Sequence, residues 1–465
     1  MRDLERVVRG LLRRSGLNRP AFFSVATRGV QSTTALVTIV FVGRFLTLES
    51  QGYYYAILSF VAFVMLGEFG LNYAVMQSAS HEAAALTGDR AEPMYERVIT
   101  RLRALLVGAK RFTAYTTSLA VVLVAAIGTR TFVSSRTPGL PSGAWAGPWV
   151  LAILGVAASQ QLAPRFALLE GTGGAAAVWR FRMQQELAIA TTLWTALALG
   201  FGLWSLGIAY TTRFIYSTIW LRSHSAAELL RALVHGDASA SPPSNYWRTE
   251  VWPFQWRIGL SVVSGYFIFQ LLTPIVFALD GAHAAGQFGM TMAITNGLLT
   301  ATTAWLNSQA PLYGRLIAQR DYGELNREFT RAVGSSFVVV VAAAVAVISV
   351  VAVLAARRHP ISMRLLPPLP FALLMASTVI NHLIFALAVY LRAHRREPLL
   401  IPSVAGALLT ALTIYLTARS GNLVWVTGSY LALTALGGLV TLMIFVSRSR
   451  SWHARDPLMT TTDAA

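Results

Sequence analysis

Residues 332–355 read AVGSSFVVVVAAAVAVISVVAVLA, a run of 24 residues without a charged side chain. Arg331 precedes the run directly, and Arg357 and Arg358 follow it closely. A helix needs about 20 apolar residues to cross the hydrocarbon core of a bilayer, which is about 30 Å thick. The stretch therefore predicts a transmembrane helix with basic residues at both ends.

Eleven more stretches of the chain qualify when the rest of the sequence is read in windows of the same size. Helices are the spanning structures that satisfy every backbone polar group within one segment. We therefore predict an all-α polytopic membrane protein with about 12 transmembrane helices. The twelve windows lie near 21–45, 52–78, 112–132, 146–168, 185–203, 206–222, 257–279, 284–312, 332–355, 368–391, 399–418 and 424–446.

The basic residues avoid every second gap between these windows. Of the 38 Lys and Arg residues, 29 fall in the N-terminus, the even-numbered gaps and the C-terminus or at the window edges beside them. Six fall in or at the edge of the odd-numbered gaps, namely Arg130, Arg136, Arg357, Arg358, Arg364 and Arg419, and the other three, Arg28, Arg44 and Arg213, lie within spans. Basic loops stay on the cytoplasmic side during insertion. We therefore predict a multi-pass protein of the bacterial cytoplasmic (inner) membrane with both termini in the cytoplasm.

Composition excludes several classes of protein. Charged residues make up 12% of the chain and hydrophobic residues 55%, whereas a soluble domain carries about 25% charged residues. The net charge of +18 is spread over short loops, which favours membrane orientation and contact with anionic lipids over nucleic-acid binding. The absence of cysteine excludes disulfides and thiolate metal sites. The first apolar stretch is too long for the hydrophobic core of a signal peptide, so we predict that it remains a span.

The sequence predicts five regions along the chain. They are a cytoplasmic amphipathic N-terminus, an N-terminal six-helix lobe, a cytoplasmic inter-lobe tether, a C-terminal six-helix lobe and a cytoplasmic tail, at 1–19, 20–222, 223–256, 257–446 and 447–465. The N-terminus has apolar residues at helical spacing and a basic face, as expected of a helix that lies on a membrane surface.

Residues 94–110 repeat this basic amphipathic design, and we predict a second membrane-surface helix there. The two halves of the chain also resemble each other. Gly52-x-x-x-Ala56-Ile57 recurs 237 residues later as Gly289-x-x-x-Ala293-Ile294. Both halves start inside, which predicts a parallel repeat around a central cavity, an arrangement found in transporters.

Three ionisable residues lie deep in the predicted spans of the N-terminal half. Arg28, Glu68 and Arg213 each sit roughly 12–14 Å from the cytoplasmic boundary at 1.5 Å per residue. A charge at that depth costs about 2.5 kcal/mol or more, so it is paired, hydrated or functional. One interpretation is that the two arginines bind an anionic group, because a guanidinium matches phosphate or carboxylate and stays charged. The alternative is a purely structural Arg28–Glu68 pair.

Other polar residues in the spans are weaker candidates. We expect Gln31, Arg257, Gln270 and Asn296 to contribute to substrate binding, although amides in membranes also bond neighbouring helices. His382 is the histidine that lies deep in a span, where it either carries a proton or is a neutral core residue. Arg44 and Asp280 occupy the outer ends of corresponding spans, as outer gate candidates or as side chains that extend to the interface.

Several short segments resemble the Wzx-type polysaccharide flippases of the multidrug/oligosaccharidyl-lipid/polysaccharide (MOP) exporter superfamily. They cover nearly the whole chain in the order found in that family, although Thr47 stands where the family has glycine. The segments are Arg44-Phe45-Leu46 with Ser50-Gln51-Gly52-Tyr53-Tyr54, Gly67-Glu68-Phe69-Gly70-Leu71, Gly202-Leu203-Trp204-Ser205-Leu206 and Gln319-Arg320-Asp321-Tyr322-Gly323-Glu324-Leu325.

The resemblance implies two six-helix lobes and transport of an undecaprenyl-diphosphate-linked oligosaccharide by alternating access, for cell-surface polysaccharide synthesis. It also implies a cationic cavity, which suits Arg28 and Arg213 as diphosphate contacts. Family transport is often coupled to H+ or Na+, for which Glu68 and His382 are the buried titratable candidates. The implied partners are the polyprenyl-diphosphate-linked glycan, membrane lipids, and a polysaccharide polymerase or other glycan-assembly proteins.

Three other functions compete with this hypothesis. They are a multidrug exporter of the same superfamily, a membrane glycan polymerase, and a scaffold that does not transport. The chain contains no GxxxxGK[ST] phosphate-binding loop and no HExxH, and its gaps are too short for a catalytic loop. We therefore expect no enzymatic activity, no cofactor and no bound metal apart from a coupling ion.

Overall fold

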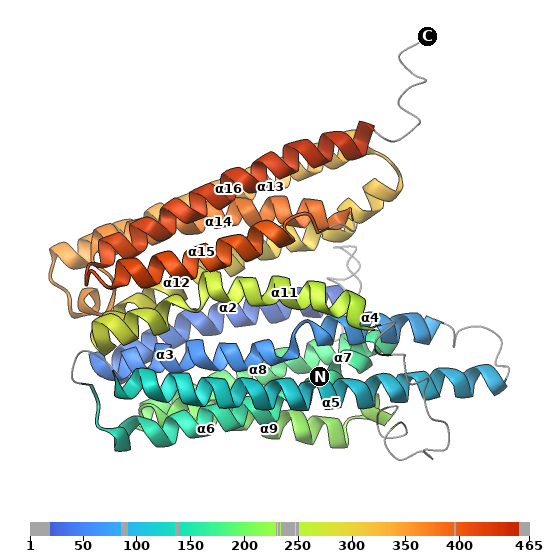
Figure 1. The fold of residues 1–465 in the computed structure, drawn as a ribbon, viewed down its shortest axis with the longest axis horizontal. Coiled ribbons are helices and arrows are strands. Elements are labelled where there is room, and N and C mark those ends of the chain that lie inside the picture. The colour runs from blue at the N-terminus through green and yellow to red at the C-terminus, as the bar shows by residue number, and fades with distance from the viewer. Residues whose placement is uncertain are drawn as a thin grey trace, which may run out of the picture. The chain divides into compact units, whose positions relative to one another are not determined.

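The computed structural model describes residues 19–84, 92–134, 139–228, 251–394 and 397–454, together with 230, 233 and 247. In these residues the chain is helical, without strands (Figure 1). The predictions for residues 1–18, for most of the tether and for residues 455–465 lie outside the described residues. The described part is a polytopic all-α membrane protein, as the sequence predicts.

Each of the twelve predicted windows falls on helix. Within the described residues, nine helical runs are long and apolar enough to cross a membrane, judged by length and composition. Gln255–Ala318 contains two of the predicted windows, and Ser142–Ala198 contains one window and most of another, near 185–203. The window near 206–222 coincides with a further helix, α9 (Trp204–Ser223).

The helices form two compact units, which divide between Gly286 and Gln287 inside α12. Unit 1 contains helices up to the first turns of α12, and unit 2 the remainder. The helices and short helical turns are α2 (Arg19–Phe45), α3 (Leu48–Met65), η1 (Leu66–Glu68), α4 (Leu71–Ala84), α5 (Glu92–Val133), α6 (Ser142–Gln160), α7 (Ala163–Leu169), η3 (Glu170–Gly174), α8 (Ala175–Ala198), α9, η4 (Ser225–Ala227), α11 (Trp252–Phe269), α12 (Leu272–Ala318), α13 (Tyr322–Ala356), η6 (Pro360–Arg364), α14 (Pro368–Ala393), α15 (Leu400–Ala418) and α16 (Leu423–Ala454).

In unit 1, α8 packs between α2 and α9, and α9 also packs along α6. An aromatic cluster holds the other side of the unit together, where α3, α5, α6 and α12 meet. Its rings lie 4.8–6.2 Å apart between centroids and belong to Tyr53, Phe132, Trp145, Trp149 and Phe277. Such edge-to-face and offset contacts add stability beyond the buried apolar area.

The basic segment 94–110 differs from the sequence prediction. It is not a separate helix at the membrane surface but the first part of α5, which continues into the third predicted span. Its apolar face, including Leu102 and Leu105, is fully buried in a cluster with α4, α7 and α8. A pattern of helical periodicity reports an apolar face, but it does not reveal whether lipid or protein covers that face.

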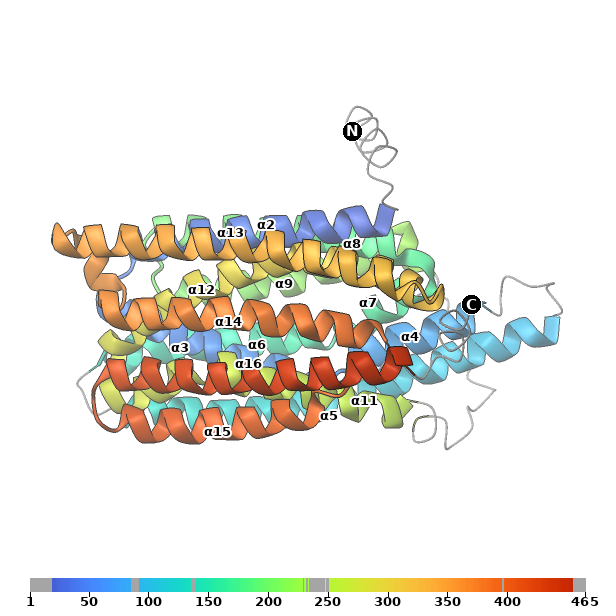
Figure 2. The same cartoon turned by 90° about the horizontal axis from the view of Figure 1, so that it is seen from above.

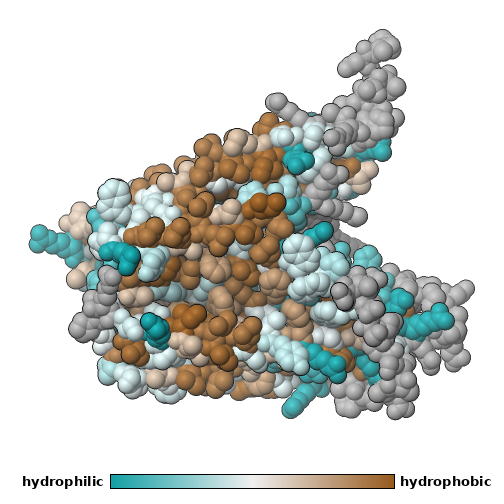
Figure 3. Space-filling view, in the orientation of Figure 1, coloured by the Kyte–Doolittle hydropathy of each residue, from teal (hydrophilic) through white to brown (hydrophobic). Residues whose placement is uncertain are grey.

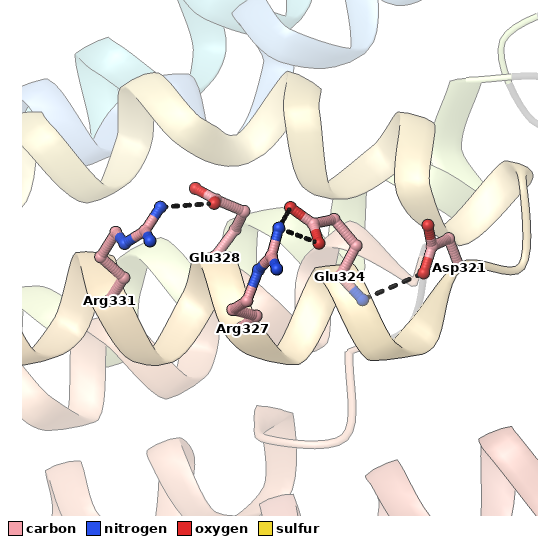
Figure 4. Close-up of polar contacts among 5 residues, drawn as sticks. All are labelled: Asp321, Glu324, Arg327, Glu328 and Arg331. Atoms are coloured by element: carbon pink, nitrogen blue, oxygen red, sulfur yellow. Dashed lines mark hydrogen bonds and ion pairs between the residues drawn. The ribbon is translucent and has the colours of Figure 1, made fainter.

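In unit 2, α14 packs against both α13 and α16, and α16 also packs along α15 (Figure 2). The start of α13 carries three local polar contacts (Figure 4). The Asp321 carboxylate accepts a hydrogen bond from Glu324 N at 3.0 Å and so caps the helix. Two ion pairs follow at a spacing of three residues, Arg327–Glu324 at 2.6 Å and Arg331–Glu328 at 3.0 Å.

Hydrophobic side chains gather over the middle of the helices, and hydrophilic ones gather toward the helix ends (Figure 3). Large apolar side chains are exposed on the outer helices of both units, for example Val122, Leu154, Val345 and Leu439. An exposed apolar surface of this extent is far larger than that of a soluble monomer. It is the surface expected of helices that face lipid.

Candidate functional site: a charged layer in unit 1

A break in the second predicted span positions Glu68. After α3, the one-turn η1 is followed by Phe69 and Gly70, which both have left-handed backbone angles (φ 44° and 72°). Gly67 packs so closely on α5 that a Cβ at this position would lie 3.2 Å from Thr117 Cα. The Gly67-Glu68-Phe69-Gly70 sequence thus produces a kink between α3 and α4, and the acidic residue lies inside it.

The kink frees backbone carbonyls that water cannot reach inside a membrane. Gln160 at the end of α6 satisfies one of them, because its Nε2 donates to Met65 O at 3.0 Å. Gln160 is buried and therefore ties α6 to the end of α3. This amide connects neighbouring helices, in accordance with the general role of amides in membranes.

Glu68 lies near two cationic residues, one on α8 and one on α9. Its carboxylate accepts a short hydrogen bond from Asn72 Nδ2 on α4. It is also close enough to Arg182 and Arg213 to interact with both electrostatically. Among the described residues no ion pair within 4 Å involves Glu68, so the carboxylate balances two guanidinium groups without being locked to either.

Arg182 on α8 is a site residue that the sequence analysis missed. Its guanidinium pairs with Glu170 at 2.9 Å and lies 4.6 Å from the centre of the Trp179 ring. The predicted span began at residue 185, so Arg182 was assigned to a loop, whereas α8 begins ten residues earlier at Ala175. Extending the helical pattern to Val178 and Phe181, which are both buried, could have found it.

Arg213 lies halfway along α9 and is half-buried. Its backbone carbonyl accepts a hydrogen bond from Gln185 Nε2 at 3.2 Å, and the same amide donates to Ser217 Oγ at 2.6 Å. Its side chain lies near Tyr210, which in turn lies near Glu186. In the described part of the chain, the Arg213 guanidinium takes part in no ion pair within 4 Å.

Arg28 is half-buried on α2, which α8 holds in place. The neighbouring Thr27 donates to Trp179 O across the two helices at 3.1 Å. Arg28 forms no ion pair with any described residue, so the structural Arg28–Glu68 pair does not form here. The arginines that interact electrostatically with Glu68 are Arg182 and Arg213.

Two further cations lie close together in the same unit. Lys110 on α5 and Arg165 on α7 are near enough to interact electrostatically, and both are half-buried. Neither residue was among the site residues predicted from the sequence. Like charges in contact are destabilising unless an anion or solvent screens them, so this pair extends the cationic character of unit 1.

The other predicted binding residues of unit 1 are less enclosed. Gln31 is exposed on α2, and Arg257 is exposed on α11 with its guanidinium 5.7 Å from the centre of the Trp256 ring. Gln270 ends α11 and is half-buried, with its backbone N–H donating to Tyr266 O at 2.8 Å. No hydrogen bond or ion pair between described residues joins these three side chains to Arg28 or Arg213.

The two outer gate candidates also lie in unit 1. Arg44 is exposed in the last turn of α2, and Asp280 is half-buried in α12. Asp280 directly precedes Gly281, whose backbone (φ 88°, ψ −178°) bends α12. This bend separates the seventh predicted span from the eighth, and the seventh span is itself broken between α11 and α12.

Two predicted site residues belong to unit 2. Asn296 is half-buried on α12. His382 on α14 is fully buried, and its Nε2 lies 3.0 Å from Ser336 Oγ on α13. His382 Nδ1 is buried without a hydrogen-bond partner among the described residues. Beside it, the Asn381 side chain hydrogen-bonds the Tyr430 hydroxyl, so α13, α14 and α16 are connected by polar contacts.

Comparison with known proteins identifies the fold. No protein-family model matches the sequence, and no curated protein matches it. A multidrug resistance MATE family transporter of the MOP superfamily, in its inward-facing conformation, has a TM-score of 0.61 at 12% identity, covering 90% of this chain and 99% of its own. An outward-facing conformation from the same family has a TM-score of 0.53 at 12% identity, covering 93% and 96%.

A MOP superfamily transporter from Pyrococcus furiosus also matches, with a TM-score of 0.51 at 13% identity over 92% of this chain and 95% of its own. The reversed polarity of its binding pocket is reported to suggest a different function. At these identities the likeness concerns the fold. The protein is therefore a polytopic helical membrane protein with the fold of the MATE transporters of the MOP superfamily.

Proposed function

We propose that the protein is a flippase that moves a polyprenyl-diphosphate-linked oligosaccharide across the cytoplasmic membrane. The observation that supports this proposal most directly is the pair of half-buried arginines, Arg28 and Arg213, which form no ion pair among the described residues and lie in helices that the sequence predicts to span the membrane. At the depth that the sequence predicts, a charge without a close ion-pair partner costs about 2.5 kcal/mol or more. An anionic cargo would offset that cost when it binds.

The surrounding charges suit a diphosphate better than an organic cation. Arg182 lies near the same carboxylate as Arg213, and Lys110 and Arg165 add two more positive groups to unit 1. Planar guanidinium groups bind phosphate oxygens in a bidentate manner. In the proposed mechanism Glu68 partly neutralises Arg182 and Arg213 while the site is empty, and the diphosphate replaces it when cargo enters.

The proposed transport cycle involves no covalent chemistry. The carrier would enter from the cytoplasmic leaflet with its diphosphate at Arg28 and Arg213. Alternating access of the two lobes would then release the glycan on the far side, while the polyprenyl tail stays in the lipid. The lobe boundaries at 222 and 257, and Arg44 and Asp280 as the outer gate, belong to this proposal.

Coupling to an ion gradient is assigned to two residues in this proposal. Glu68 accepts a hydrogen bond from Asn72 and interacts electrostatically with Arg182 and Arg213. His382 has one ring nitrogen near Ser336 and the other buried without a partner in the described structure. A proton arriving at either side chain changes the charge of a buried site, which requires a compensating rearrangement. Protons or Na+ can serve at Glu68, and protons at His382.

A multidrug exporter is the competing function, and it is favoured by the names of the matching solved structures. The two functions require opposite charge in the site. An exporter of organic cations depends on acidic side chains, so loss of Glu68 would abolish its activity while loss of the arginines would not. The Pyrococcus furiosus neighbour supports the view that pocket polarity differs between proteins with this fold.

The test is to replace Arg28 and Arg213 separately by alanine and to measure lipid-linked glycan on each face of the membrane. Arg180→Ala is the matched control, because Arg180 is exposed on α8 close to Arg182. We expect each site variant to lose about tenfold or more of its export rate, because charge-assisted contacts contribute about 1.5–3 kcal/mol. The control variant should export normally.

The proposal fails if both site variants export glycan at the wild-type rate with normal protein levels in the membrane. Export of a fluorescent organic cation that is lost in Glu68→Gln but kept in the arginine variants would establish the multidrug alternative. The same assay with Arg28→Lys and Arg213→Lys tests the geometry, since lysine keeps the charge but loses the bidentate fork.

A further inference from the structure

Unit 2 contains a cavity of about 400 Å³ where α13 ends and α14 begins. It is lined by one residue of α12, by the last turns of α13 and by the segment that leads into α14, namely Gln287, Val351, Ala355, Arg358, Ser362, Met363, Leu365, Leu366, Pro367 and Pro368. This volume lies within the range of about 300–1,000 Å³ that is typical of small-molecule sites. None of the residues that line the cavity is acidic.

The cavity is held open by hydrogen bonds from α12. Gln287 Nε2 donates to Met363 O at 2.8 Å, and Leu366 N donates to Thr291 Oγ1 at 3.2 Å. Ser362 Oγ donates in turn to His359 O at 2.7 Å. The segment between α13 and α14 is therefore fixed at several points, so the cavity is formed before any ligand arrives.

Arg358, which lines the cavity, has an unfavourable backbone conformation. Its φ is +49°, and its N–H donates to Ala355 O at 3.0 Å while His359 N donates to Leu354 O at 2.9 Å. These two bonds form a Schellman motif, in which the left-handed position is usually glycine. A strained non-glycine residue beside a cavity suggests that its side chain is needed there.

The same segment carries a cluster of basic residues on the predicted outer side of the membrane, where basic residues are few. Three of the six basic residues in the odd-numbered gaps are Arg357, Arg358 and Arg364. Basic residues are depleted from outward-facing loops. A cluster of three arginines in a loop predicted to face outward is therefore an exception to this rule. Next to it, Val350, Val353 and Leu369 expose apolar side chains of the kind that contact lipid.

We propose that this cavity binds the phosphate of a membrane amphiphile, with the Arg358 guanidinium on the phosphate and the apolar walls against the first part of the hydrocarbon chain. Arginine is suited to phosphate because its donors form a rigid fork. The shared chemistry is a lipid phosphate, which either an anionic phospholipid or a polyprenyl diphosphate supplies. The site is separate from Arg28 and Arg213 and stands independently of the proposed function.

The experiment measures ligand retention by native mass spectrometry of the purified full-length protein. Three probes are offered separately: phosphatidylglycerol, farnesyl diphosphate and phosphatidylcholine. Arg358→Gly removes the guanidinium and relieves the backbone strain, so it should not lower the melting temperature. Arg358→Met removes the charge but keeps a side chain at the left-handed position, and so separates charge from strain.

The chain offers a matched control at the opposite end of α13. Arg320 (φ +61°) occupies the same position of a second Schellman motif, with Arg320 N donating to Ile317 O and Asp321 N to Leu316 O. Arg320 does not line the cavity. Arg320→Gly should therefore change stability as Arg358→Gly does, but leave ligand retention at the wild-type level.

We expect both Arg358 variants to retain about tenfold less of at least one anionic probe, since about 1.4 kcal/mol corresponds to a factor of ten in affinity. Loss of phosphatidylglycerol alone identifies a phospholipid of the surrounding bilayer, and loss of farnesyl diphosphate identifies the polyprenyl carriers. The proposal is overturned if neither anionic probe depends on Arg358, or if Arg320→Gly reduces retention equally.

Discussion

At the scale of single residues, the kink that carries Glu68 depends on glycine. Gly70 has φ +72°, and a Cβ at this position would lie 2.8 Å from Gly259 N and 2.8 Å from Ile258 Cγ2 on α11. Gly70→Ala should therefore lower stability by about 2–4 kcal/mol, combining about 1 kcal/mol of backbone strain with the cost of overpacking. Thermal melting of the purified protein measures this loss.

Gly200 offers the control that separates the two contributions. It has a similar φ of +81°, but a Cβ there would meet nothing within 4 Å. Gly200→Ala should cost about 1 kcal/mol, the strain alone. Equal melting temperatures for the two variants would mean that α11 does not press on the kink, and the account of how Glu68 is held would then be wrong.

The sequence predicted part of the charged layer and missed part of it. Depth along a span places Arg28, Glu68 and Arg213 at one level, because rise per residue is nearly constant in helices. Depth does not give the direction of a side chain, so the sequence could not tell that Glu68 interacts electrostatically with Arg182 and Arg213 rather than with Arg28. Arg182 was missed because helix ends are the least certain part of a sequence prediction.

At the scale of elements, the first half of α5 tests whether protein or lipid covers an apolar face. Leu105 is fully buried, whereas Val107 on the same helix is 42% exposed. Leu105→Ala should cost about 2–5 kcal/mol, because the buried methyl groups leave a cavity. Val107→Ala should cost less than about 0.5 kcal/mol. Thermal melting in detergent compares the two variants.

Comparing the two variants distinguishes the continuous helix α5 of the structure from the separate membrane-surface helix that the sequence predicts at residues 94–110. A helix lying on the membrane would expose Leu105 to lipid or detergent, and its truncation would then be nearly neutral for folding. Similar small losses for both variants would restore the surface helix at residues 94–110. A large loss for Leu105→Ala alone would support one continuous helix.

Breaks inside helices were harder to predict than the helices. Among the described residues, the apolar windows located each helical run that is long and apolar enough to cross a membrane, since about 20 apolar residues are a strong signal. The interruption near Gln270, the bend at Gly281 and the turn at Gly173 fall within continuous helical runs. They arise from single left-handed glycines or from local packing, which hydropathy averaged over a window does not detect.

At the scale of the whole molecule, the distribution of charge predicts the orientation of every helix at once. α13 is long enough to join the two sides of a membrane, because its 35 residues extend about 50 Å at 1.5 Å per residue. Gln319 precedes it on the predicted cytoplasmic side, and Met363 follows it on the predicted outer side. Both residues are exposed.

The chain contains no cysteine, so a single introduced thiol can be labelled without background. A membrane-impermeant maleimide added to intact cells should label Met363→Cys, and should label Gln319→Cys only after the membrane is opened. The physical reason is the excess of basic residues that keeps the even-numbered gaps inside.

The reverse pattern would place Arg358 and its cavity in the cytoplasm, and a layer containing Arg28 and Arg213 would then lie closer to the outer leaflet. In that orientation a lipid carrier that enters from the cytoplasmic leaflet could not bind at Arg28 and Arg213 as the first step. The labelling result therefore tests the order of events in the proposed cycle as well as the topology.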